Sequence, residues 1–180
     1  MLLRSYGCRL RARTSSRLLA FRAAPTPGAS ALAEFLARLE AEHGDPVAAF
    51  DHLTLAIRNY HNSDNTTTIR APLAGLAALF DRLGRYEPAA TIAGFALSPL
   101  TAAAVPEVTT AITHLRDELG EATYESLARK GETMITAAMA TYAYDQIDQA
   151  RTTLEHPAEW QASSLTAVAI RRGPVGVCGP

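Results

Sequence analysis

Five histidines are the first side chains of this sequence to consider for metal binding or catalysis: His43, His52, His61, His114 and His156. No two of them lie four residues apart, the spacing that places two ring nitrogens on one metal ion along a helix. His52 and His61 would join Asp51 and Asp64 in a metal site only if the loop after His61 folded back. We therefore expect surface and helix-end histidines, and no metal.

The sequence also lacks the motifs of nucleotide binding and nucleophilic catalysis. A phosphate-binding loop needs a lysine followed by serine or threonine, but the single lysine, Lys130, is followed by Gly131-Glu132. There is no Gly-x-Ser-x-Gly motif for an activated serine. The two cysteines, Cys8 and Cys178, stand at opposite ends of the chain, which argues against a thiolate metal site. We expect no enzymatic activity and no cofactor.

Acidic residues gather around Gly120: Asp117, Glu118, Glu121 and Glu125. Carboxyl groups that are buried together can transfer protons in catalysis. These acids flank an expected turn and have Arg116 and Arg129 close in the sequence. A solvated face is the interpretation we favour.

Three residues near the C-terminal end could contact a partner protein: Tyr142, Met139 and Trp160. Met134 and Met139 beside Tyr142 form either an adaptable binding groove or part of a buried helical stripe, and we favour the core. Trp160 follows the last expected helix. It either packs against the helices or anchors a partner, and we favour packing.

Charge is distributed unevenly along the 180 residues, whose net charge is −1. Residues 1–33 contain six arginines and no acid, whereas residues 34–170 contain eighteen acids and nine basic residues. Residues 1–28, a basic arm that ends in Pro25-Thr26-Pro27-Gly28, are typical of a tail outside the fold. A targeting segment and an arm that contacts nucleic acid phosphates are the alternatives.

The segments that carry these side chains are predicted to be helices. Apolar residues recur at helical spacing from Ser30 onward, as at Leu32, Leu36 and Leu39, and a buried stripe is expected from Val47 to Tyr60. The expected helices cover 30–43, 46–60, 69–83, 87–97, 105–119, 121–130 and 133–155. Aspartate or proline begins several of them. Gly44, Gly84 and Gly120 end three, and Gly131 ends the short helix over 121–130. No core segment longer than four residues alternates as a strand does. The sequence predicts an all-α fold without a membrane-spanning helix.

The spacing of these glycines indicates stacked pairs of helices. Gly44, Gly84 and Gly120 are separated by 40 and 36 residues, and helical-repeat solenoids have periods of about 34 to 47 residues. Leu83-Gly84-Arg85-Tyr86 is similar to the tetratricopeptide pattern. We expect antiparallel hairpins stacked as a short TPR-like solenoid over 29–156, with a long C-terminal helix and an irregular tail at 157–180.

Residues 113–154, above all the segment GEATYESLARKGE, resemble the C-terminal stretch of actinobacterial STAND-class ATPase regulators of the LuxR type. Residues 34–98 resemble the repeat region of the same family. A bacterial source also fits the excess of arginine over lysine, 16 to 1. The resemblance implies a cytoplasmic repeat module that contacts a protein partner. This chain lacks the phosphate-binding loop, and no DNA-reading helix is evident after residue 155, so ATP hydrolysis and DNA binding are not implied.

The sequence thus favours a non-enzymatic helical-repeat module for regulatory protein contacts. The alternative is a nucleic-acid-associated regulator that uses the N-terminal arginine arm.

Overall fold

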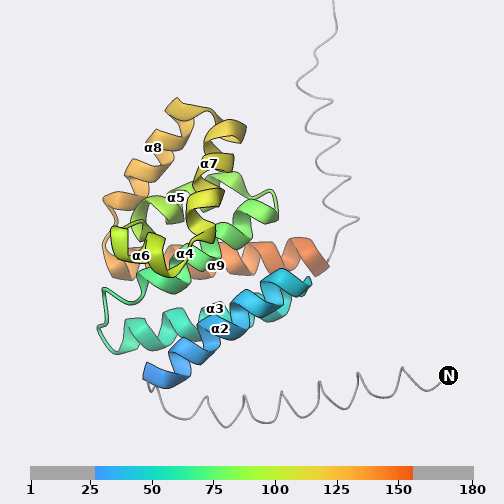
Figure 1. Ribbon diagram of the computed structural model, residues 1–180, viewed down its shortest axis with the longest axis vertical. Helices are drawn as coiled ribbons and strands as arrows, with labels where there is room; N and C mark the ends of the chain where they lie inside the picture. Colours follow the sequence, from blue (N-terminus) through green and yellow to red (C-terminus); the bar gives the residue numbers. More distant parts are fainter. Residues whose placement is uncertain (1–26, 156–180) are drawn as a thin grey trace, which may run out of the picture. The chain divides into compact units, whose positions relative to one another are not determined.

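The computed structural model describes residues 27–155, and every regular element in this range is an α-helix (Figure 1). The helices are α2 (Pro27–His43), α3 (Pro46–Asn62), α4 (Arg70–Arg82), α5 (Tyr86–Ala96), α6 (Pro99–Ala104), α7 (Glu107–Leu119), α8 (Glu121–Glu132) and α9 (Thr136–Glu155). The all-α prediction is confirmed for this range. None of these helices is long and apolar enough to cross a membrane. Residues 1–26 of the expected arm, the C-terminal tail and Trp160 lie outside the described residues. The predicted end of the arm at Gly28 was wrong, because Pro27 and Gly28 belong to α2.

The chain divides into two compact units, Met1–Ala143 and Tyr144–Pro180, with the boundary inside α9. The described part of the second unit is the C-terminal portion of α9, up to Glu155. All contacts discussed below belong to the first unit.

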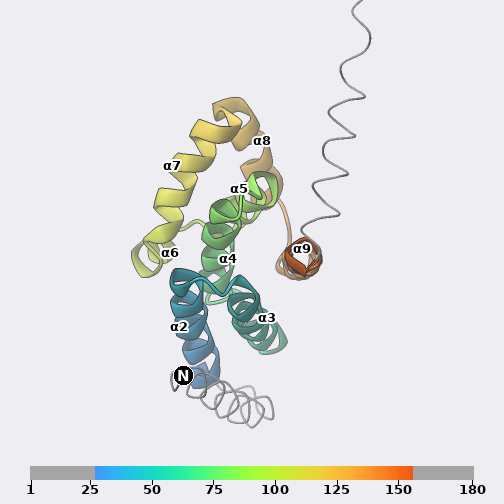
Figure 2. The ribbon, with the colours of Figure 1, turned by 90° about the vertical axis from the view of Figure 1, so that its right-hand side faces the viewer.

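Helices α2 and α3 form an antiparallel hairpin (Figure 2) whose turn follows from three residues. Gly44 has a φ of 93°, a backbone conformation that glycine adopts without steric cost. Asp45 then caps α3, its carboxylate accepting a hydrogen bond of 3.1 Å from the amide of Ala48. Pro46 occupies the first helical position, where no hydrogen bond is lost. The predicted turn is confirmed.

The core between α3 and α4 consists of the apolar stripes that the sequence predicts. Phe50 and Phe80 are fully buried, with ring centroids 5.6 Å apart and tilted planes. This geometry is one that aromatic pairs favour. Ile57, Leu73 and Leu76 are fully buried beside them.

The prediction was wrong for the face that α2 buries. Leu32 and Leu39, expected to point inward, are exposed, and Leu36 is half-buried. Alanines line the buried face instead: Ala29, Ala33 and Ala37. They recur every four residues, and their short side chains let two helix backbones approach closely. Val47 of α3 is likewise exposed rather than buried.

Helices α5 and α8 cross at very short range because each contributes a glycine. A methyl group at Gly94 would overlap the backbone of Ala128, and one at Gly131 would overlap the carbonyl group of Thr91. Gly131 lies inside α8, which ends at Glu132. The expectation that Gly131 ends this helix was therefore wrong: it is a packing residue.

Helix α6 was not predicted, because a residue pair such as Ser98-Pro99 is typical of the end of a helix. The same two residues begin α6: the Ser98 hydroxyl accepts a hydrogen bond of 3.1 Å from the amide of Thr101, and Pro99 takes the first helical position. Helix α9 begins at Thr136, three residues later than expected.

Helix α7 packs on α4, and α8 packs on α5.

Candidate binding groove

A groove runs along α2 where this helix faces α4 and the link between α6 and α7. It consists of two hollows, of about 160 Å³ and about 30 Å³. Both hollows are lined by Arg38, Leu53, Gly75 and Val105. We refer to the two together as the α2 groove.

Small side chains form much of the groove wall. Helix α4 contributes Ala71, Gly75 and Ala78, which recur at the four- and three-residue steps of one helix face. A methyl group at Gly75 would lie 3.7 Å from Cδ2 of Leu53, an ordinary contact distance. Helix α2 contributes Ala31 to the larger hollow, and Ala37 and Ala41 to the smaller one. The hollow exists because these side chains are too short to fill it.

An ion pair links α2 to α7 at the groove. The guanidinium of Arg38 donates a hydrogen bond of 2.6 Å to Oε1 of Glu107. Both side chains are more than a third exposed, so the pair adds at most about 1 kcal/mol to stability. Since Arg38 lines both hollows, it stands where they meet.

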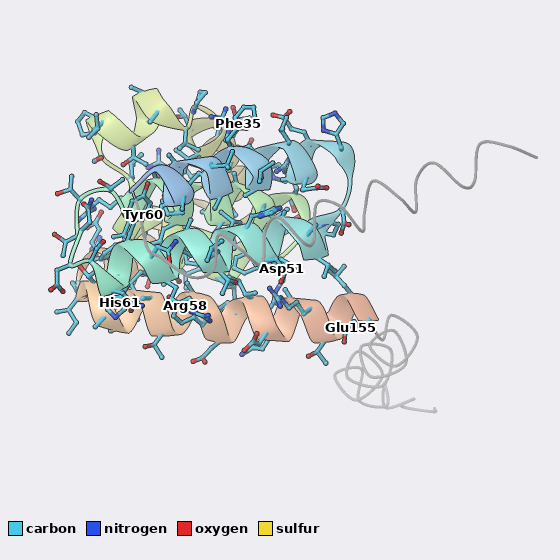
Figure 3. The ribbon with its side chains drawn as sticks, turned by 90° about the horizontal axis from the view of Figure 1, so that it is seen from below. Phe35, Asp51, Arg58, Tyr60, His61 and Glu155 are labelled. Carbon is cyan, nitrogen blue, oxygen red and sulfur yellow. The ribbon has the colours of Figure 1, made fainter. Side chains whose placement is uncertain are left out.

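Glu34 is the most perturbed acid in the groove. Burial raises its pKa to about 7, although a hydrogen bond with Tyr60 and the charge of Arg38 act in the opposite direction. Figure 3 shows Tyr60 between α2 and α3. The same contact contributes to the pKa of Tyr60, which burial above all raises to about 12.

Two carboxylate oxygens of the groove residues are buried without a hydrogen-bond donor. They are Oε1 of Glu34, a residue that lines the larger hollow, and Oε2 of Glu107, a residue that lines the smaller one. A buried acceptor without a donor costs about 1–3 kcal/mol, and more when it is charged. A cationic donor that entered the groove would remove this cost.

Phe35 forms an apolar rim beside these carboxylates. Its side chain is 59% exposed and lines the larger hollow. Figure 3 shows it on the edge of α2 that faces away from α3. Leu32 and Leu39, three residues before and four after it, are also exposed. The groove therefore combines an apolar rim with buried carboxyl oxygens that lack hydrogen-bond donors.

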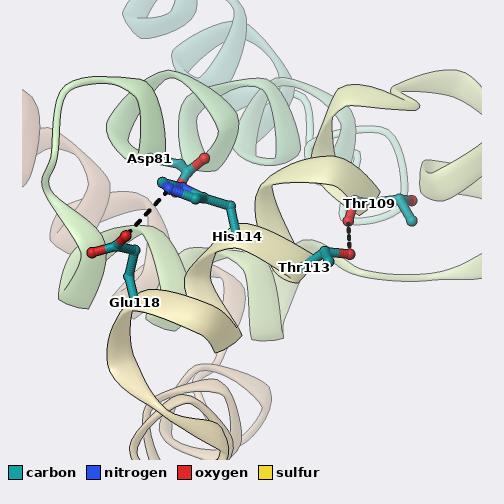
Figure 4. Close-up of polar contacts among 5 residues, drawn as sticks. All are labelled: Asp81, Thr109, Thr113, His114 and Glu118. Carbon is teal, nitrogen blue, oxygen red and sulfur yellow. Dashed lines mark hydrogen bonds and ion pairs between the residues drawn. The ribbon is translucent and has the colours of Figure 1, made fainter.

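A second polar cluster joins α4 to α7 (Figure 4). Nδ1 of His114 lies 2.8 Å from Oδ1 of the nearly buried Asp81, and its Nε2 lies 3.7 Å from Oε1 of Glu118. The hydrogen bond with Asp81 and its charge raise the pKa of His114. The ring of Tyr86 packs edge-on against the imidazole, with centroids 5.7 Å apart. The imidazole of His114 is the group of this cluster whose protonation is favoured. None of these residues lines either hollow of the α2 groove.

Of the three predicted contact residues, the structure describes Met139 and Tyr142, and neither lines this groove. Met139 is fully buried, as the favoured interpretation of a core residue requires. Tyr142 is half-buried: burial raises its pKa, its hydroxyl is hydrogen-bonded with Thr91, and the Lys130 ammonium lies 5.9 Å from its ring centroid.

The described histidines and the acidic patch around Gly120 also lie outside the groove lining. The expectation of surface and helix-end histidines was wrong for His52. His52 is buried on α3, and its burial lowers its pKa. In the acidic patch, Arg116 pairs with Glu125 at 2.9 Å. No group of three or more histidine, cysteine or acidic residues in the described part of the chain could hold a metal ion.

Sequence reasoning missed Glu34, Arg38 and Phe35 because it assigned the buried face of α2 to leucines. The signal that could have found them is the alanine series Ala29, Ala33 and Ala37. If this series is the buried face of α2, the groove residues lie on the face next to it. No family model, curated protein or solved structure matches this chain.

Proposed function

We propose that this chain is a non-enzymatic interaction module that binds a basic, apolar segment of another protein in the α2 groove. One observation carries the proposal: a hollow of about 160 Å³ is lined both by the exposed Phe35 and by Glu34, whose Oε1 is buried without a hydrogen-bond donor.

The size and lining of the hollow suit one large apolar side chain. Cavities of about 150 Å³ are large enough for a benzene molecule. Leu53 and Val105 supply apolar contacts in the groove, and Phe35 supplies an aromatic contact at its rim. An amphipathic segment that places a leucine or phenylalanine in such a groove is a common mode of peptide recognition.

The carboxylates define the charge of the ligand. Arginine and lysine provide the donors that Glu34 Oε1 and Glu107 Oε2 lack. Charge-assisted hydrogen bonds of this kind are about twice as strong as neutral ones. The preferred ligand is therefore a segment with a leucine or phenylalanine next to an arginine or lysine.

We include in this proposal that the helices form a repeat architecture. The hairpin of α2 and α3, the pair of α4 and α5, and the pair of α7 and α8 are the successive units of a short TPR-like array. The packing of α7 on α4 and of α8 on α5 supports this assignment. A regulatory role like that of the repeats in LuxR-type ATPase regulators rests on the resemblance of residues 113–154 and 34–98.

Selection from a phage-displayed library of random twelve-residue peptides tests the function. The native chain and a Leu18→Ser/Leu19→Ser/Phe21→Ser variant are both used as bait, because residues 17–22, Arg-Leu-Leu-Ala-Phe-Arg, have the same apolar and basic composition as the expected ligand. We expect enriched peptides with arginine or lysine beside leucine or phenylalanine, and at least tenfold weaker binding of these peptides to Phe35→Ala. Leu100→Ala, which removes an exposed leucine outside the groove, is the matched control. No enrichment on either bait, or undiminished binding to Phe35→Ala, would refute the function.

A further inference from the structure

We propose that residues 17–22 of this chain, Arg-Leu-Leu-Ala-Phe-Arg, are an intramolecular ligand of the α2 groove. The inference rests on the proposed function and names one occupant of the same site. It makes the N-terminal region a tethered competitor of any other protein that binds there.

The chemistry of this segment matches the groove. Leu18, Leu19 and Phe21 provide large apolar side chains for the hollow beside Phe35. Arg17 and Arg22 flank them, and a guanidinium provides five N–H donors. These are the groups that the two unpartnered carboxylate oxygens of the groove require.

The covalent connection allows the contact. From Pro27, the first residue of α2, to Arg38 at the junction of the hollows, a helix rises about 16 Å. The six residues from Phe21 to Pro27 span up to about 20 Å when extended. Phe21 can therefore reach any position along the larger hollow, and Leu18 can reach farther.

Long-range electrostatics favour the same contact. Residues 1–33 contain six arginines and no acid, whereas residues 34–170 have an excess of nine negative charges. Attraction between the two regions raises the local concentration of the segment near the groove. A short tether alone gives an effective concentration in the millimolar range, so even a weak contact would occupy the groove.

Fluorescence anisotropy with a fluorescein-labelled peptide of residues 15–24, SSRLLAFRAA, tests the inference. Three full-length chains are compared: the native protein, the Leu18→Ser/Leu19→Ser/Phe21→Ser variant, and a Leu2→Ser/Leu3→Ser/Tyr6→Ser control with equally many apolar residues replaced farther from α2. We expect the first variant to bind the peptide at least tenfold more tightly than the native protein. The control should bind as weakly as the native protein. Adding Phe35→Ala to the first variant should abolish the gain.

The outcomes separate this inference from the proposed function. Equal affinity of the native chain and the first variant would overturn the intramolecular contact, as would failure of the peptide to bind any chain. The proposed function would survive either result if library selection still enriched groove-dependent peptides. A dimer of the native chain that the first variant abolishes would place the segment in the groove of a second copy, and would also overturn the intramolecular form.

Discussion

Glu34 links the groove to the stability of the fold. Its pKa of about 7, well above its ordinary value of 4.5, means that the folded protein binds more protons than the unfolded chain between these two values. Stability is therefore highest below pH 4.5 as far as this group is concerned, and falls as the pH rises toward 7. Partial exposure reduces the effect to about 1–2 kcal/mol.

Glu34→Gln should remove this pH dependence. We expect urea unfolding of the variant to show a smaller decrease in the free energy of unfolding from pH 5 to pH 8 than the native protein shows, and a value about 1–2 kcal/mol above that of the native protein at pH 8. Glu42→Gln, which changes an exposed carboxylate of the same helix, should retain the native profile. If the free energy of unfolding of Glu34→Gln depended on pH as strongly as that of the native protein, Glu34 would not be the cause of the pH dependence.

His114 should lose its raised pKa when Asp81 is neutralised. The hydrogen bond and the charge of Asp81 are the two largest causes of the shift, and Asp81→Asn removes the charge while keeping the size of the side chain. We expect an NMR titration of the imidazole to give a lower pKa in Asp81→Asn than in the native protein. Glu118→Gln, whose carboxylate lies at 3.7 Å, should give a smaller decrease. If Glu118→Gln lowered the pKa of His114 as much as Asp81→Asn or more, Asp81 would not be the main cause of the raised pKa.

Sequence reasoning could identify residues with strong local roles but not those defined by long-range contacts. Asp45 was recognisable because its partner lies three residues away. The contacts of Asp81 with His114 and of Arg38 with Glu107 span 33 and 69 residues. No local spacing rule relates such positions, so neither pair was predicted.

At the scale of elements, the crossing of α5 and α8 depends on the absence of side chains at two glycines. Gly131→Ala would place a methyl group against the carbonyl of Thr91, so the helices must separate. We expect a loss of about 2–3 kcal/mol in thermal or urea unfolding. Gly94→Ala should have a similar effect through Ala128.

Gly75→Ala is the matched control, because it makes the same change within a helix where the new methyl group meets Leu53 at 3.7 Å. Alanine has the higher helix propensity, so this variant should be up to about 1 kcal/mol more stable than the native protein. If Gly131→Ala were as stable as Gly75→Ala, the close crossing would not exist.

The order and the ends of the helices could largely be predicted from the sequence, whereas the buried face of α2 could not. Capping and glycine signals located most helix ends to within three residues, as at Pro46 and Leu119. Helix α2 contains both a leucine series and an alanine series. Periodicity weighted by hydrophobicity selects the leucines, but close packing of the hairpin buries the alanines. The exposed leucines and Phe35 are the apolar surface that results.

In the whole molecule, the first compact unit supports the α2 groove. Residues from three separate parts of the chain line it: Ala31 to Glu42, Leu53 to Arg82, and Ala104 to Glu107. Only the folded arrangement of α2, α3 and α4 with the α6–α7 link brings them together, so the groove was not predictable from any one segment.

Alanine-methyl NMR tests the central claim most directly. The Leu18→Ser/Leu19→Ser/Phe21→Ser chain is labelled at its alanine methyl groups and titrated with the most enriched peptide from the library selection. We predict chemical-shift changes at the groove residues Ala31, Ala71 and Ala104, with little change at Ala93 and Ala128, which lie outside the groove on α5 and α8. Changes centred on Ala93 and Ala128, or no changes at saturating peptide, would contradict the claim that the α2 groove is the binding site.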